Sequence, residues 1–76
     1  MDAVKIKNTE DLGSRIRSKR KELKLTLEEA SGLCGVGFRF LSELERGKNT
    51  SEIGKVLQVL SRLGLELHLS SKGKTG

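Results

Sequence analysis

The chain has 76 residues, enough for one small domain, and 15 Lys and Arg against 10 Asp and Glu give a formal net charge of +5. Only 34% of residues are apolar, Cys34 is the single cysteine, and no apolar run is long enough for a transmembrane helix or signal peptide. We therefore expect a cytoplasmic binding module rather than a secreted or membrane protein. One His and one Cys give no nucleophile–base pair or metal-ligand spacing, so we predict no enzymatic activity, metal or cofactor.

The positive charge is concentrated in residues 15–24. This stretch contains six basic residues and one acidic residue, and the charges of the remaining residues cancel. A clustered positive field attracts polyanions such as nucleic acids. An ordinary solvated helix face would have the same composition, so charge alone does not identify the partner.

The N-terminal part of the chain predicts an arm followed by a helix. Val4 and Ile6 alternate with lysines, which is typical of a short strand or an extended arm within residues 1–8. Asn8 or Thr9 can cap the helix that follows. The helix would place three apolar side chains on one face, namely Leu12, Ile16 and Leu23.

Two short helices joined by a glycine turn are predicted next. Thr26 and Glu29 form a capping box that begins a helix over 26–34. Gly35 can adopt the positive φ needed in the turn, and a further helix covers 37–46. This pattern indicates a helix-turn-helix unit, whose second helix can enter a DNA major groove.

A fourth helix and a strand complete the predicted elements. Asn49 and Glu52 offer a capping pair, Gly64 ends the helix, and the expected apolar face consists of Ile53, Val56, Leu57, Leu60 and Leu63. Apolar and polar residues alternate over 65–69, which predicts a β-strand. We expect the tail, 70–76, to be disordered.

Three segments resemble the phage-repressor and Cro type of helix-turn-helix domain, the XRE class: SRIRSKRKELKLT, GVGFRFLSELERGK and IGKVLQVLSRLGL. The resemblance extends from about Leu12 to Leu63 and implies a mostly α, four-helix, lambda-repressor-like domain over 9–64. The chain departs from the family at Leu27, where a phosphate-contacting Gln is common, and at Ala30-Ser31, where Leu-Ala is usual. We expect backbone N–H groups of the second helix, capped by Thr26, to take over the phosphate contact.

The resemblance also implies which residues contact DNA. It places Phe38, Arg39, Ser42 and Glu43 at base edges, with Arg39 suited to guanine, Phe38 to a thymine methyl, and Glu43 to cytosine or to bracing a neighbouring arginine. Residues that follow the recognition helix suit phosphates. The full predicted set is Thr26, Phe38, Arg39, Ser42, Glu43, Arg46, Lys48 and Asn49. In this family, residues at the positions of Arg20 and Glu45 form a partly buried ion pair.

The predicted strand requires a partner, because an isolated strand leaves its backbone groups unpaired. It could pair with the N-terminal segment, with the same strand of a second subunit, or with another protein. A four-helix domain followed by LGLELHL is similar to the HipB-type bacterial antitoxins. This similarity implies a homodimer joined through Leu65, Leu67 and Leu69, a palindromic operator, and a HipA-type kinase toxin as partner.

Three functions are compatible with these features. The first is an operator-binding repressor that serves as the antitoxin of a toxin–antitoxin pair. The second is a stand-alone phage or plasmid repressor. The third is a protein-interaction module with weak DNA binding, which is suggested by Leu27 and by the acidic residues near the third helix.

Overall fold

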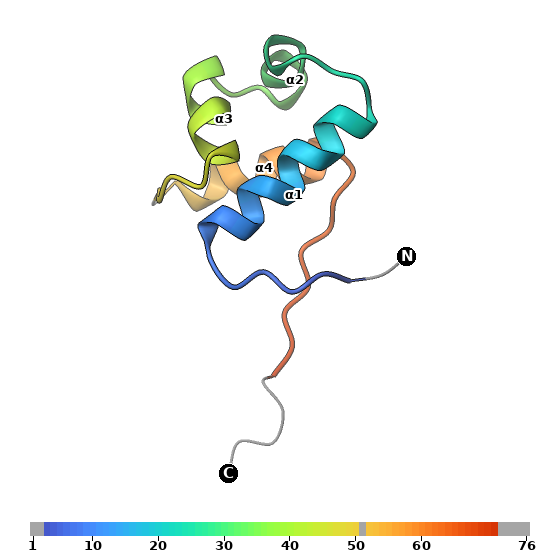
Figure 1. The fold of residues 1–76 in the computed structure, drawn as a ribbon. Helices are drawn as coiled ribbons and strands as arrows, with labels where there is room; N and C mark the ends of the chain where they lie inside the picture. Colours follow the sequence, from blue (N-terminus) through green and yellow to red (C-terminus); the bar gives the residue numbers. More distant parts are fainter. Residues whose placement is uncertain (1–2, 51, 72–76) are drawn as a thin grey trace.

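The computed structural model describes residues 3–50 and 52–71, and this part of the chain forms four α-helices. They are α1 (Thr9–Glu22), α2 (Leu27–Cys34), α3 (Phe38–Glu45) and α4 (Ile53–Arg62). Figure 1 shows α2 and α3 together at one side of the molecule, while the segments before α1 (3–7) and after α4 (65–71) extend from the other side. The predicted mostly α, four-helix architecture is confirmed. None of the helices described is long and apolar enough to cross a membrane.

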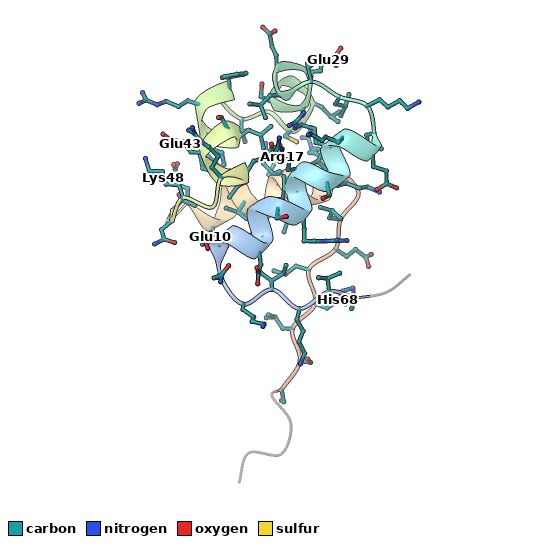
Figure 2. The ribbon with its side chains drawn as sticks, viewed as in Figure 1. Glu10, Arg17, Glu29, Glu43, Lys48 and His68 are labelled. Carbon is teal, nitrogen blue, oxygen red and sulfur yellow. The ribbon has the colours of Figure 1, made fainter. Side chains whose placement is uncertain are left out.

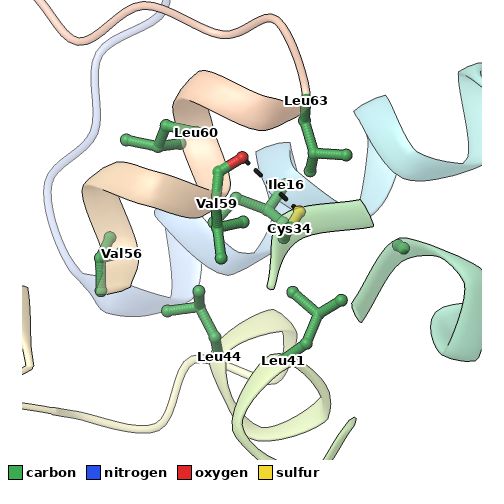
Figure 3. Packing of buried hydrophobic residues seen from close by; sticks show 9 residues of the cluster. Ile16, Cys34, Leu41, Leu44, Val56, Val59, Leu60 and Leu63 are labelled. Atoms are coloured by element: carbon green, nitrogen blue, oxygen red, sulfur yellow. Dashed lines mark hydrogen bonds between the residues drawn. The ribbon is translucent and has the colours of Figure 1, made fainter. Parts of the chain in front are cut away.

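All four helices contribute to a single hydrophobic core. Each Val, Leu or Ile side chain that is fully buried in this core stabilises the folded state by about 1.5–3 kcal/mol relative to an exposed one. Around the core lie partly buried apolar side chains, including Leu12, Leu27, Phe40 and Leu65. The buried core residues, most of which Figure 3 labels, are Ile16, Ala30, Cys34, Leu41, Leu44, Val56, Val59, Leu60 and Leu63.

The predicted turn chemistry between the first three helices is confirmed. Thr26 Oγ1 accepts a hydrogen bond from the Glu29 backbone N–H at 3.0 Å, and Glu29 Oε1 accepts one from the Thr26 N–H at 2.9 Å. Gly35 ends α2 with φ +72°. Asn8 caps α1 by accepting a hydrogen bond from the Asp11 N–H at 2.8 Å. These caps are local in sequence, which is why the sequence predicts them.

The predicted capping pair of the fourth helix is wrong. The helix begins at Ile53, and its N-cap Glu52 makes no side-chain capping hydrogen bond. Asn49 does not reach the helix, because its Oδ1 lies 2.9 Å from Thr9 Oγ1 at the start of α1. The Thr50 hydroxyl instead accepts a hydrogen bond from the Glu52 N–H at 3.0 Å.

The inward face of α4 also differs from the prediction. Ile53 is 62% exposed and Leu57 is exposed, whereas Val59 is fully buried. The buried stripe is formed by Val56, Val59, Leu60 and Leu63. Both sets satisfy a helical period, and packing against α2 and the rest of the core determines which one is inward.

The predicted strand over 65–69 is not formed in the described part of the chain. Residues 65–71 have no regular secondary structure, and the Leu65 N–H donates to the Leu60 carbonyl at 2.8 Å rather than to another strand. Within the described residues, 3–7 and 65–71 share no backbone hydrogen bond, so neither segment has a ladder partner. Part of the predicted arm (residues 1–2) and of the predicted disordered tail (72–76) lies outside the described residues.

Candidate nucleic-acid interface

Helix α3 has one buried and one exposed face. Leu41 and Leu44 are inside the core, while Phe38 and Arg39 are exposed at the start of the helix. The Arg39 side chain is 90% exposed. Ser42 and Glu43 are partly exposed one turn later. Because the pairs 38/42 and 39/43 are each four residues apart, these four side chains lie on one side of the helix.

Glu43 forms two ion pairs on this face. Its Oε2 lies 3.5 Å from Arg39 Nε, and its Oε1 lies 3.3 Å from Lys48 Nζ. The pKa of Glu43 is lowered, mainly by the hydrogen bond from Lys48 and further by the positive charges of Lys48 and Arg39, although partial desolvation opposes the shift. The carboxylate is therefore ionised at neutral pH.

The loop after α3 is fixed against the first turn of α1. Gly47 has φ +87°, and a Cβ there would lie 2.8 Å from Glu10 Cα, so only glycine fits. The Thr9 hydroxyl donates to the Gly47 carbonyl at 2.6 Å. On either side of Gly47, Arg46 and Lys48 are exposed, as is Asn49. Figure 2 shows Glu43 and Lys48 close together at this edge, with Glu10 nearby.

The start of α2 provides the remaining predicted DNA contact. The Thr26 hydroxyl is occupied by the Glu29 N–H, and Leu27 packs against the core. The first backbone N–H groups of a helix have no intrahelical acceptor and can bind an anion. Glu28 and Glu29 lie in this first turn, however, and their charges oppose the approach of a phosphate.

Arg20 and Glu45 meet across α1 and α3. Arg20 Nε and Nη2 donate to the two carboxylate oxygens of Glu45 at 2.7 and 3.0 Å, and Nη1 donates to the Leu25 carbonyl at 2.9 Å. The two side chains are only 11% and 5% exposed. The hydrogen bond and charge of Glu45 raise the pKa of Arg20, although burial opposes the shift. The pair fixes the orientation of α3 relative to α1.

Sequence reasoning missed a second connection, between α4 and the end of α2. Gln58 Nε2 donates to the Cys34 carbonyl at 2.6 Å, and Arg62 Nη1 donates to the Leu33 carbonyl at 3.2 Å. These bonds satisfy carbonyl groups that a helix C-terminus leaves free. In the sequence, this connection is indicated only by the spacing of Gln58 and Arg62, two polar residues four apart on one side of α4.

Cys34 and His68 do not belong to this surface. Burial raises the pKa of the Cys34 thiol, although the charge of Arg62 opposes the shift, so the thiol is protonated and serves as a core side chain. His68 is exposed on the C-terminal segment, where its Nε2 lies 3.2 Å from Glu66 Oε1.

The structure places the predicted functional residues in separate regions. The DNA-contacting candidates on α3 and the following loop are contiguous, and Thr26 lies apart from them at the start of α2. The predicted interface residues lie on the C-terminal segment, where Leu65 packs on the core, Leu67 is half exposed and Leu69 is 91% exposed.

Comparisons with known proteins identify the family. The model of the family described as Helix-turn-helix matches residues 16–69. The chain is 46% identical over 72 residues to the "Uncharacterized HTH-type transcriptional regulator y4mF" of Sinorhizobium fredii (strain NBRC 101917 / NGR234), covering 95% of each chain.

Solved structures share the fold. The clp gene regulator ClgR from C. glutamicum is 32% identical, with a TM-score of 0.71 over 87% of this chain and 85% of that chain. A chain of the HipA-HipB-O2-O3 complex is 19% identical, with a TM-score of 0.80 over 91% of this chain and 97% of that chain. The chain therefore belongs to the XRE-type helix-turn-helix family of DNA-binding transcriptional regulators.

Proposed function

We propose that the protein is a sequence-specific transcriptional repressor that binds a palindromic operator as a homodimer in the bacterial cytoplasm. The observation that carries this proposal is the exposed face of α3, where a 90% exposed Arg39 projects beside Phe38 and Ser42. A helix with this composition can enter a major groove and read base edges there.

Each predicted DNA-contacting residue except Glu43 receives a role from its place on this surface. Arg39 donates to guanine, Phe38 packs on a thymine methyl, and Ser42 hydrogen-bonds a base edge or phosphate. In the loop after α3, Arg46, Lys48 and Asn49 contact phosphates. The free backbone N–H groups at the start of α2, which Thr26 caps, contact a further phosphate, although the charges of Glu28 and Glu29 weaken this contact. The ion pair of Arg20 and Glu45 holds α3 in the orientation that this docking requires.

We further propose that the repressor is a HipB-like antitoxin, which regulates its own operon and neutralises a HipA-type kinase toxin. The support is the HipB-like fold and the segment over 66–71, which makes no backbone hydrogen bond within the described part of the chain and can pair with a second subunit. Coexpression with the kinase encoded by an adjacent gene tests this role. We expect the two proteins to copurify and growth inhibition by the kinase to be relieved, and growth arrest that persists would contradict the role.

DNA binding by wild type and Arg39→Ala tests the repressor function directly. Affinity for the duplex upstream of the protein's own gene is measured at two salt concentrations, with an unrelated duplex as competitor. We expect the wild type to prefer the upstream duplex and to weaken strongly with salt. Arg39→Ala should lose about 1–3 kcal/mol of discrimination, which is about 5- to 150-fold in affinity for the upstream duplex.

Arg15→Ala is the matched control, since it removes the same charge from α1. Arg15 lies beside Val4 and Ile6, whereas Gly13 and Arg20 are among the α1 residues that contact α3. We expect only a small loss of affinity in this variant. Equal losses in both variants, or a wild type without preference for the upstream duplex, would contradict the proposed function.

A further inference from the structure

The carboxylate of Glu43 lies beneath the two cations that it pairs with. Arg39 is one turn before it on α3, and Lys48 is in the loop that follows. The Glu43 side chain is 25% exposed, against 90% for Arg39 and 64% for Lys48. One carboxylate therefore holds both cations from their inner side, and neither cation is blocked from solvent.

Apart from its two ion pairs, this negative charge is unfavourably placed for both the helix dipole and DNA. Glu43 and Glu45 lie in the second half of α3, whose last turn contains no basic residue, and an anion near a helix C-terminus opposes the helix dipole. Arg20 neutralises Glu45. Glu43, in contrast, lies on the face proposed to approach phosphates, where its charge would repel them.

The contact with Arg39 leaves the guanidinium fork available. The ion pair joins Glu43 Oε2 to Arg39 Nε, while bidentate recognition of guanine uses the two terminal Nη groups. A side chain anchored at Nε has fewer conformations than a free arginine. Its two terminal donors can then face outward without leaving the carboxylate.

We propose that Glu43 is a specificity-determining positioning residue, which orients Arg39 for base recognition and restrains Arg39 and Lys48 from binding phosphates of non-cognate DNA. This inference rests on the proposed operator-binding function. On cognate DNA the Arg39 fork meets guanine while Nε stays beside Glu43. On non-cognate DNA, Arg39 and Lys48 would exchange the Glu43 carboxylate for a phosphate, so the net gain in binding free energy is small.

The test compares Glu43→Gln with Glu22→Gln, a control that removes the same charge from the exposed end of α1, where Glu22 pairs with Lys19. For Glu43→Gln we expect affinity for an unrelated duplex to rise about 2- to 5-fold for each ion pair released. The slope of log affinity against log salt should steepen by about 0.9 for each additional phosphate contact. Affinity for the upstream duplex should stay constant or fall, so the preference shrinks.

A double variant and a stability measurement separate positioning from folding. In the Arg39→Ala background, Glu43→Gln should no longer weaken binding to the upstream duplex. Affinity for the unrelated duplex should still rise, because the substitution also releases Lys48. The melting temperature of Glu43→Gln should change little, because the loss of two surface ion pairs and the removal of a charge that opposes the helix dipole act in opposite directions.

Two results would overturn the inference: equal loss of affinity for both duplexes in Glu43→Gln, or the same rise on unrelated DNA in Glu22→Gln. A wild type that does not prefer its upstream duplex would instead contradict the operator-binding function. The measurements on unrelated DNA would still decide the role of Glu43.

Discussion

At the scale of single residues, Arg20 holds α3, the proposed recognition helix, against α1. It uses three donors at once, two to Glu45 and one to the Leu25 carbonyl, in a site where both charged side chains are largely buried. Removing one partner of a buried pair typically costs about 3–5 kcal/mol, because the remaining charge has no counter-ion. We therefore expect Arg20→Ala to lose that much free energy of unfolding, as measured by urea denaturation.

Arg39→Ala is the matched control for this measurement, because it truncates an arginine that is 90% exposed. Its stability should stay within about 0.5 kcal/mol of wild type. Arg20→Lys should recover only part of the loss, since a single ammonium cannot reproduce the bidentate geometry. The raised pKa of Arg20 keeps the guanidinium charged, so its contribution is complete at neutral pH and is lost only as pH rises through that pKa. An Arg20→Ala variant as stable as Arg39→Ala would contradict this account.

At the scale of elements, the backbone of α1 at Gly13 packs directly against the backbone of α3. A Cβ at Gly13 would lie 2.6 Å from the Glu45 carbonyl oxygen and 2.8 Å from its carbon, and both are backbone atoms that cannot move aside cheaply. Alanine favours a helix by about 1 kcal/mol over glycine, but overpacking costs about 1–3 kcal/mol. We expect the clash to prevail, so Gly13→Ala should lower the melting temperature.

Gly32→Ala provides the opposite case within the same fold. Gly32 lies inside α2, is exposed, and has no atom within 4 Å of an added Cβ. Because only helix propensity changes at this position, Gly32→Ala should raise the free energy of unfolding by about 0.5–1 kcal/mol. Thermal unfolding of the two variants should therefore show shifts of opposite sign. Stabilisation by both substitutions would show that α1 and α3 are not in close contact at Gly13.

The sequence predicts those elements whose determinants are local. The capping box of Thr26 and Glu29 and the positive φ of Gly35 define α2 within ten residues, and the structure contains both. Asn49 was misassigned because its partner, Thr9, is 40 residues away. The sequence likewise shows only that Gly13 has a low helix propensity. Its contact with Glu45 forms only when α1 and α3 pack together.

In the candidate site, the sequence predicts the exposed face of α3 but not the contacts between elements. The helical period separates exposed Arg39 from buried Leu41, so the face of α3 follows from the pattern. The ion pairs of Glu43 involve the loop residue Lys48 and depend on the path of the chain after Gly47. The hydrogen bond from Gln58 to the Cys34 carbonyl joins two helices and has no local signal.

At the scale of the whole molecule, the single chain leaves apolar surface uncovered. Ile53 and Leu57 are exposed on α4, and Leu67 and Leu69 are exposed on the C-terminal segment. A strand is a property of a pair of segments, so the alternation over 65–69 cannot produce one in a chain where residues 3–7 do not pair with it. Pairing with a second copy would satisfy the backbone groups and cover the leucines.

We therefore expect the protein to be a dimer in solution, and the double substitution Leu67→Asp with Leu69→Asp to make it monomeric. Each leucine contributes about 1.5–3 kcal/mol when buried, and every dimer would lose four of them. Analytical ultracentrifugation over a range of concentrations measures the change, and circular dichroism should show unaltered helices. Because a palindrome needs two recognition helices about 34–36 Å apart, affinity for the upstream duplex should fall with the dimer.

His68→Asp is the control for this prediction, since residue 68 alternates with the leucines and its exposed side chain faces Glu66. It adds a negative charge to the same segment without removing apolar surface, so the dimer should persist. Pairing of the segment with residues 3–7 of the same chain would instead give a wild-type monomer at every concentration. In that case the two leucine substitutions would lower the melting temperature and leave the sedimentation coefficient unchanged, which would contradict the proposed homodimer.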